Sequence, residues 1–147
     1  NLIALNKLYK NANLNAVEIN NHACKIMKKR LKKIKVYNAS IKTFNLKQKF
    51  DLVLVKGVLI HLNPKELKNT YKKIFQFSKK YILIAEYFSP NPTTLLYRRH
   101  RNKLFKRDFA GEFLDKFPKT KLLNYGFVYN RDKHPQDNIN WFLIKKR

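Results

Sequence analysis

The chain has 147 residues, of which 44% are hydrophobic and 14% aromatic, which fits one globular domain with a buried core and excludes a disordered chain. No apolar run reaches the roughly 18 residues of a membrane span, and no charged-then-apolar leader indicates secretion. The lone Cys24 cannot form an internal disulfide, so we expect a cytoplasmic protein. Its place on a predicted helix beside Met27 favours a buried structural thiol over a nucleophile.

The net charge of +24 suggests the hypothesis that the protein binds nucleic acid or a membrane surface. The excess is mostly lysine and is distributed along nearly the whole length, while asparagine is abundant and glycine occurs only three times. An AT-rich genome gives this composition to any protein. We therefore favour a solvated basic surface over a dedicated nucleic-acid face, which stays as the alternative.

Apolar periodicity predicts helices and strands in an α/β alternation. In chain order, we expect a helix over 1–10, a strand over 14–19, a helix from 20, strands over 34–37 and 50–56, a helix from 64, a strand over 81–88, a helix over 109–117, and strands over 121–129 and 140–144. Residues 89–107 are expected to be irregular and very basic. The last two strands are expected to pair antiparallel.

The strand at 50–56 is the most informative segment. Residues 52–55 are four consecutive aliphatics, which predicts a strand buried on both faces of a parallel sheet. Asn63, Pro64 and Glu66 then form a helix start signal. In open α/β folds ligands bind outside the carboxyl ends of such strands, so we expect the chemistry near residues 56–61.

The alternation lacks its first strand, because the chain begins inside a predicted helix. We expect residues 1–147 to be a single domain that forms the carboxyl-terminal part of a longer α/β domain. Glu18, at the exit of the first predicted strand, has the position of the acid that binds ribose hydroxyls in nucleotide-binding folds. A solvated acid at a strand end is the alternative. Ser40 and the backbone N–H of Ile41 are candidate adenine contacts, although the neighbouring Asn38 can equally make a turn.

Several segments resemble the elements of class I S-adenosylmethionine-dependent methyltransferases, and in particular those associated with pseudaminic acid biosynthesis. The segments are VEIN at 17–20, FDLVLVKGVLIHLNP at 50–64, AEY at 85–87, YR-H at 97–100, LFKRDFAGE at 104–112, YGFVY at 125–129 and PQD at 135–137. The resemblance implies a Rossmann-like, mostly parallel sheet with an antiparallel carboxyl-terminal strand. The first strand and the glycine-rich loop of the family are missing, so we expect the chain alone to be inactive.

The resemblance implies methyl transfer from S-adenosylmethionine to a sugar or nucleotide-sugar acceptor. The implied cofactor-binding residues are Glu18, Ile19, Ser40, Ile41, Lys56 and Gly57. A hydroxyl or amine acceptor has to lose its proton, and the candidate catalytic residues are His61, His100 and Glu86. A structural role for His61 is the alternative. Glu86 ends a buried strand, where a contact with substrate or cofactor is favoured over an unpaired carboxylate.

The basic segment is the expected acceptor site, because its many donors suit a carboxylate or a phosphate. The candidate substrate-binding residues are Tyr87, Tyr97, Arg98, His100, Lys106 and Arg107. A solvated basic loop is the alternative. No His/Cys cluster has metal-binding spacing. Two further hypotheses stay open: an RNA methyltransferase that uses the basic surface, and a non-catalytic binding domain that retains the fold.

Overall fold

The computed structural model describes all 147 residues, which divide into two compact units. We call residues 1–45 the N-terminal unit and residues 46–147 the C-terminal unit. Each is described by itself. No helix in either unit is both long enough and apolar enough to cross a membrane.

The N-terminal unit is a small βαβ arrangement preceded by a helix. Its elements are α1 (Leu2–Leu8), β1 (Asn15–Glu18), α2 (Asn21–Arg30) and β2 (Lys35–Asn38). The two strands pair in parallel, with Glu18 opposite Asn38, so their carboxyl ends lie at the same edge. Cys24, Ile34 and Val36 form the core of the unit.

Helix α2 begins as the sequence predicts, because the side chain of Asn20 accepts a hydrogen bond from the backbone N–H of Ala23 at 3.0 Å. The Cys24 thiol is buried and donates to the carbonyl of Glu18 at 3.3 Å, which confirms the prediction of a buried thiol. Ile26 of the same helix is 41% exposed, because the packed face of α2 is the one that carries Cys24 and Met27.

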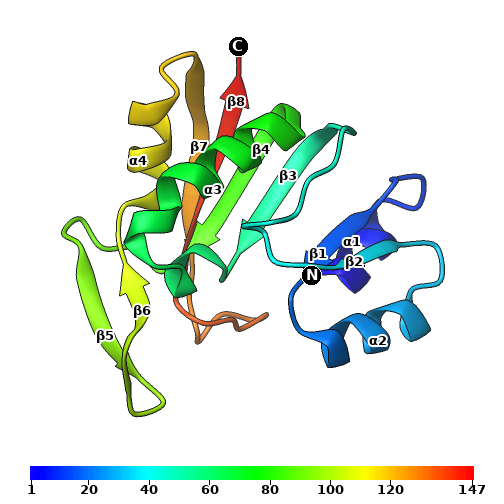
Figure 1. The fold of residues 1–147 in the computed structure, drawn as a ribbon, viewed down its shortest axis with the longest axis horizontal. Helices are drawn as coiled ribbons and strands as arrows, with labels where there is room; N and C mark the ends of the chain where they lie inside the picture. Colours follow the sequence, from blue (N-terminus) through cyan, green and yellow to red (C-terminus); the bar gives the residue numbers. More distant parts are fainter. The chain divides into compact units, whose positions relative to one another are not determined.

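The C-terminal unit is built on a four-stranded sheet (Figure 1). Its elements are β3 (Phe50–Lys56), the 3₁₀ turn η1 (Leu59–His61), α3 (Pro64–Phe77), β4 (Ser78–Glu86), β5 (Thr93–Tyr97), β6 (His100–Lys106), α4 (Phe109–Lys116), β7 (Thr120–Val128) and β8 (Ile139–Lys146). The strand order is β3-β4-β8-β7. Strands β3 and β4 are parallel, and β8 is antiparallel to both of its neighbours. Only β8 therefore runs against the others, as predicted.

Helices α3 and α4 cover one face of this sheet, α3 against β3 and β4 and α4 against β4 and β7 (Figure 1). Phe75 of α3 stacks on Phe117 with ring centroids 4.3 Å apart. The core beneath them contains Ile82, Ile84 and Ile144, each at most 1% exposed. Burial of these aliphatic side chains is the main stabilising term of the unit.

Both ends of α3 are fixed by side chains. Asn63 accepts from the N–H of Lys65 at 3.0 Å, as the helix start signal predicts. At the other end, the ammonium of Lys146 donates to the carbonyls of Phe75 and Ser78 at 2.9 and 2.7 Å. Burial there lowers the pKa of Lys146.

Strand β3 differs from its prediction. It lies at an edge of its sheet, and Leu52 is 44% exposed while Val55 is buried. The expectation of burial on both faces is wrong for the first half of the strand. Four consecutive aliphatics predict the strand but not its position, because an edge strand has a neighbour on one side only.

Residues 93–106 also differ from prediction, since they form regular structure, whereas residues 89–92 are irregular as predicted. Strands β5 and β6 form an antiparallel hairpin, with Tyr97 opposite His100. The turn residues Arg98 and Arg99 both have positive φ, of 48° and 66°. Two left-handed residues suit the twist of a tight hairpin, but Asn-Gly is the usual sequence for such a turn. The Arg-Arg pair explains why the sequence did not indicate a hairpin.

Candidate functional site

The candidate site of the C-terminal unit lies at the carboxyl edge of its sheet. Strands β3 and β4 both end there, with Lys56 beside Ala85 in the register. Gly57 then reverses the chain with a φ of +63°, a conformation that glycine adopts without steric cost. Its N–H donates to the carbonyl of Ala85 at 3.1 Å, which ties the turn to β4.

Glu86 holds this turn from the end of β4. The residue is 3% exposed, and its carboxylate accepts from the N–H groups of Val58 and Leu59 at 2.9 and 3.0 Å and of Ile60 at 3.5 Å. Burial raises the pKa of Glu86 to about 7, against the opposing effect of these three hydrogen bonds. Glu86 therefore has backbone partners, which sequence reasoning did not find. Its predicted catalytic role stays a prediction.

His61 ends the turn that Glu86 holds. Its Nδ1 lies 2.9 Å from the carbonyl oxygen of Lys103 on β6. A carbonyl can only accept, so Nδ1 carries the hydrogen, and in the neutral ring Nε2 is left with its lone pair. The imidazole is exposed and packs against the ring of Tyr97, with centroids 5.2 Å apart. These two contacts join the turn to the hairpin.

Tyr87 brings together three segments near the same edge. The ammonium of Lys106 lies 5.3 Å from the centroid of its ring, a cation–π distance. Burial and then a hydrogen bond with Asp137 raise the pKa of the Tyr87 hydroxyl. Lys56 contacts the side-chain oxygen of Gln136. Gln136 and Asp137 were missed as site residues, although the segment PQD was part of the resemblance.

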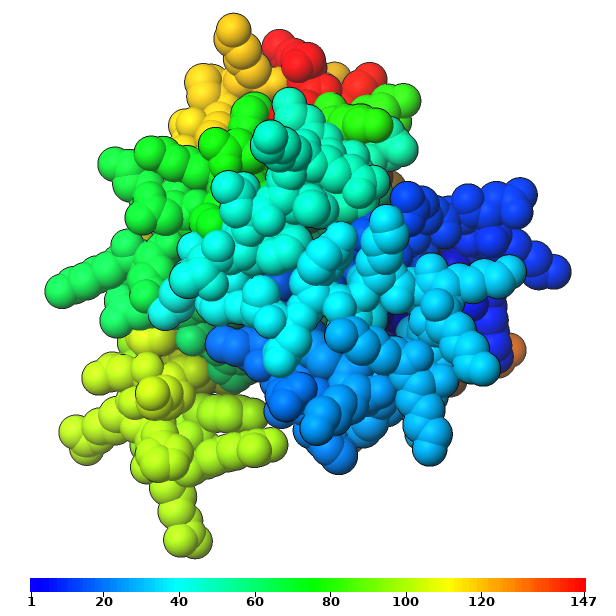
Figure 2. Space-filling model, turned by 45° about the vertical axis from the view of Figure 1, so that its right-hand side comes forward, coloured from blue at the N-terminus to red at the C-terminus, as the bar shows by residue number.

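The predicted acceptor residues divide into two groups. Arg107 pairs with Glu112 at 2.6 Å, and the hydroxyl of Tyr71 donates to the same carboxylate at 3.0 Å. Arg107 is therefore part of the packing between the hairpin, α3 and α4. Arg98 and His100 are exposed near the hairpin turn, and the Arg98 guanidinium lies 5.3 Å from the centroid of the Tyr97 ring. Figure 2 shows the long side chains of this yellow-green hairpin extending outward.

In the N-terminal unit, Glu18 lies at the carboxyl end of β1. Its Oε1 accepts from the N–H of Asn20 at 2.7 Å. Asn38 donates to the carbonyls of Glu18 and Ile19, each at 3.0 Å, and so joins the ends of the two strands. The hydroxyl of Ser40 accepts from the N–H of Lys42 at 3.2 Å, which stabilises the turn that contains Ile41. The predicted cofactor residues of this unit therefore gather at one strand edge.

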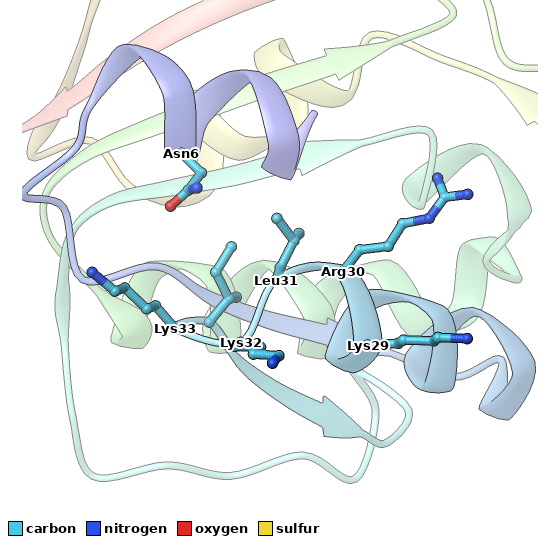
Figure 3. Close-up of a pocket in the computed structure, with 7 residues that line it drawn as sticks. Asn6, Lys29, Arg30, Leu31, Lys32 and Lys33 are labelled. Atoms are coloured by element: carbon cyan, nitrogen blue, oxygen red, sulfur yellow. The ribbon is translucent and has the colours of Figure 1, made fainter.

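A hollow of about 230 Å³ in the N-terminal unit lies elsewhere (Figure 3). It is lined by Asn6, Lys29, Arg30, Leu31, Lys32, Lys33 and Ile34. Ile34 directly precedes β2, so the hollow is at the amino ends of the strands, away from Glu18. Figure 3 shows the charged groups of Lys29, Arg30 and Lys33 extending in different directions. They do not converge on a common ligand position, and the hollow is not the candidate site.

No protein-family model and no curated protein sequence matches the chain. Solved structures do match its fold. An N1-methyltransferase for 1,6-didemethyltoxoflavin from Burkholderia thailandensis, with S-adenosylhomocysteine bound, superposes with a TM-score of 0.73 at 12% identity over 95% of this chain and 63% of that chain. The N-methyltransferase NodS from Bradyrhizobium japonicum gives a TM-score of 0.72 at 13% identity over 95% of this chain and 77% of that chain.

A S-adenosylmethionine-dependent methyltransferase from Leishmania major gives a TM-score of 0.67 at 17% identity over 90% of this chain. The chain has the Rossmann-like fold of class I methyltransferases. This confirms the predicted fold class. The chain spans 63% of the Burkholderia protein and 54% of the Leishmania protein. At these identities the likeness concerns the fold alone, so activity and substrate are taken up as proposals.

Proposed function

We propose that the chain is part of a S-adenosylmethionine-dependent methyltransferase that acts on a small-molecule acceptor. The observation that carries the proposal is the carboxylate of Glu18 at the carboxyl end of β1 in a methyltransferase fold. Only its Oε1 has a hydrogen-bond partner within the chain. Oε2 is thus available to accept from ribose hydroxyls, the role of an acid at this position in nucleotide-binding folds.

The other residues of the N-terminal unit fit the same cofactor. Asn38 fixes the backbone of Glu18 and Ile19, so the carboxylate is presented from a rigid strand end. Ser40 and Ile41 would contact the adenine. In the C-terminal unit, Lys56 and Gly57 stay predicted cofactor contacts, and a side chain on Gly57 would meet no atom within 4 Å. When bound, S-adenosylmethionine supplies a methyl group that its sulfonium already activates.

His61 is the base that the contacts favour over His100 and Glu86. The hydrogen bond from Nδ1 to the Lys103 carbonyl fixes the ring and leaves Nε2 as the acceptor. Nε2 would take the proton of the acceptor hydroxyl or amine whose oxygen or nitrogen receives the methyl group. Bound S-adenosylmethionine would supply that methyl group, with its neutral thioether sulfur as the leaving group. Glu86 already accepts from three backbone N–H groups.

The acceptor proposed is a sugar or nucleotide sugar of the pseudaminic acid type. It would carry a carboxylate or a phosphate, which suits the exposed hydrogen-bond donors Arg98 and His100 and the half-buried Lys106. Tyr87 and Tyr97 offer rings that can stack on the acceptor. Arg107 would act through its pair with Glu112, which fixes the base of the hairpin.

RNA is the second acceptor class, and the net charge of +24 favours it. A pulldown or titration with RNA at two salt concentrations distinguishes an RNA acceptor from a small-molecule acceptor. Tight RNA binding that persists at about 150 mM salt supports the RNA acceptor, and its absence supports the small molecule.

The test of the proposal is calorimetric titration of S-adenosylhomocysteine into the native gene product that contains this chain. We expect binding, and a loss of at least ~10-fold in affinity for Glu18→Ala, because two charge-assisted hydrogen bonds to ribose are removed. The control is Asp51→Ala, which removes an exposed acid of β3. No binding would contradict both enzyme readings and favour a non-catalytic domain, and full affinity in Glu18→Ala would contradict the role of Glu18.

A further inference from the structure

The loop between β7 and β8, residues 129–138, lies at the carboxyl edge of the four-stranded sheet. Strand β8 runs antiparallel to β4, and its residue Asn140 is opposite Glu86, the last residue of β4. The loop residues that directly precede β8 therefore lie next to the end of β4. Figure 1 shows the orange loop at the edge where the arrows of β3 and β4 end. The loop thus borders the candidate site of the unit.

Polar contacts hold this loop, although its residues are exposed. The side chain of Asn138 accepts from the backbone N–H of Asn130 at 3.0 Å, which brings the two ends of the loop together. Within the loop, the carboxylate of Asp132 accepts from the N–H of His134 at 3.3 Å. Loops that a rigid scaffold holds in this way often carry binding residues.

Two consecutive residues of the loop contact two neighbouring strand ends. The side-chain oxygen of Gln136 contacts the ammonium group of Lys56, the last residue of β3. The carboxylate of Asp137 accepts a hydrogen bond from the hydroxyl of Tyr87, the residue after β4. Strands β3 and β4 pair with each other, so the loop is fastened across both of their ends.

Tyr87 connects the loop to the basic hairpin. Its ring is half-buried, and the ammonium group of Lys106 lies 5.3 Å from the ring centroid. A hydroxyl that donates to a carboxylate increases the negative charge on the phenol, which strengthens the attraction between the ring and a cation. Lys106 is itself half-buried and is one of the proposed contacts of the acceptor. Asp137, Tyr87 and Lys106 therefore form one network from the loop to the acceptor site.

Asp137 differs from Asp132, the other acid of the loop. The carboxylate of Asp132 contacts the backbone of its own loop, whereas that of Asp137 contacts a side chain of the candidate site. An acid beside a site for an anionic acceptor repels that acceptor unless it contributes something else. The hydrogen bond with Tyr87 is such a contribution, because it fixes the ring against which Lys106 is placed.

We propose that Asp137 is a positioning residue of the acceptor site, which fixes Tyr87 and, through it, the ammonium group of Lys106. This role rests on the proposed function, since it assigns Lys106 to the anionic group of the acceptor. In this role Asp137 touches neither the acceptor nor the methyl donor. Its effect is on the binding of the acceptor rather than on the rate of methyl transfer.

The test is steady-state methyl transfer to pseudaminic acid by the native gene product and its variants. Asp137→Ala should raise KM about 5-fold and change kcat by less than about 2-fold, because it removes one charge-assisted hydrogen bond from Tyr87. Asp137→Asn keeps an oxygen that can accept and should recover part of the affinity. Tyr87→Phe removes only the hydroxyl, so the double variant should have the same KM as either single variant. The matched control is Asp115→Ala, which removes an exposed acid of α4 and should leave KM unchanged.

An NMR titration of the tyrosine rings tests the contact without any acceptor. Burial and then the hydrogen bond with Asp137 raise the pKa of Tyr87, so that pKa should be lower in Asp137→Ala than in the wild type. Tyr87→Phe assigns the signal. An equal pKa of Tyr87 in the two proteins would overturn the proposal.

The kinetic results can overturn it as well. Asp137→Ala with an unchanged KM would do so, and so would a lowered KM, which is the result of repulsion without positioning. Additive effects of Asp137→Ala and Tyr87→Phe would show that Asp137 does not act through the hydroxyl. Absence of turnover in the wild type would contradict the proposed acceptor and this role with it, whereas turnover with equal KM in Asp137→Ala contradicts this role alone.

Discussion

Two segments at the carboxyl edge of the C-terminal unit differ in how they are held. The turn after β3, residues 57–61, is fixed by the buried Glu86 through three backbone hydrogen bonds. The β5–β6 hairpin is exposed and basic, and its turn places two arginines at positive φ. The two segments meet where His61 donates to the Lys103 carbonyl.

The difference separates two tasks. A group that moves a proton has to be held in one orientation, and the turn provides this for His61. A group that selects the acceptor can sit on a surface element, where changes of sequence cost little stability. The turn should therefore tolerate few substitutions, while those in the hairpin should change substrate binding more than stability.

The largest expected effect is the loss of Glu86. Glu86→Ala leaves three N–H groups of the turn without their acceptor, two of them buried or nearly so, and we expect a loss of about 4 kcal/mol in the free energy of unfolding. Urea denaturation measures it. Asp51→Ala, the control, should change stability by less than about 0.5 kcal/mol. Equal stability of the two variants would contradict the role of Glu86 in holding the turn.

Burial of Glu86 should also make the stability of the chain depend on pH. Folded Glu86 has a pKa of about 7 against a reference of 4.5, so the folded chain binds this proton more tightly than the unfolded chain. The protonated Glu86 therefore contributes about 3 kcal/mol to the free energy of unfolding below pH 4.5, and this contribution is lost as the pH rises through 7. Urea denaturation of the wild type and of Glu86→Gln at several pH values between 4.5 and 7 measures the loss. A wild-type curve parallel to that of the variant would contradict the raised pKa.

Removal of the proposed base should reduce turnover rather than binding. His61→Ala should lower kcat about 100-fold with little change in KM, since it removes proton transfer but not the exposed cations. His134→Ala changes an exposed histidine of a different loop and should leave kcat unchanged. Methyl transfer to an acceptor by the native gene product measures both. If kcat is unchanged in His61→Ala, a group other than His61 removes the proton.

The smallest effect is expected in the hairpin turn. Replacing Arg98 by Asn and Arg99 by Gly gives the turn the residues that favour positive φ, so stability should rise by about 1 kcal/mol. The same change removes two cations, and KM for an anionic acceptor should rise about 10-fold. Thermal denaturation and steady-state kinetics separate the two effects. If the variant gains stability with no change in KM, the hairpin turn is not part of the acceptor site.

Local signals in the sequence predicted much of the fold. Asn63 and Pro64 marked the start of α3, and the alternation of elements indicated the α/β class. The edge position of β3 and the Arg98-Arg99 turn were not predictable in the same way. The first depends on which strands pair, and the second replaces the usual turn residues with arginines.

For the candidate site too, the sequence indicates some residues but not the contacts that they make. Glu18 and Glu86 could be selected because they lie near the carboxyl ends of predicted strands, and His61 because it follows one. Their partners could not be identified, because the N–H groups of residues 58–60 and the carbonyl of Lys103 are backbone atoms that any sequence possesses. The engagement of Arg107 by Glu112 was likewise hidden, since it depends on how the hairpin meets α4.

The central claim is that Glu18 and the other proposed cofactor residues bind the methyl donor. Hydrogen exchange of the native gene product with and without S-adenosylhomocysteine tests it most directly. We predict slower exchange at residues 18–20, 38–41 and 56–61 when the ligand is present, with no change at residues 29–34 around the hollow of the N-terminal unit. Protection confined to residues 29–34, or no protection in any of these segments, would contradict it.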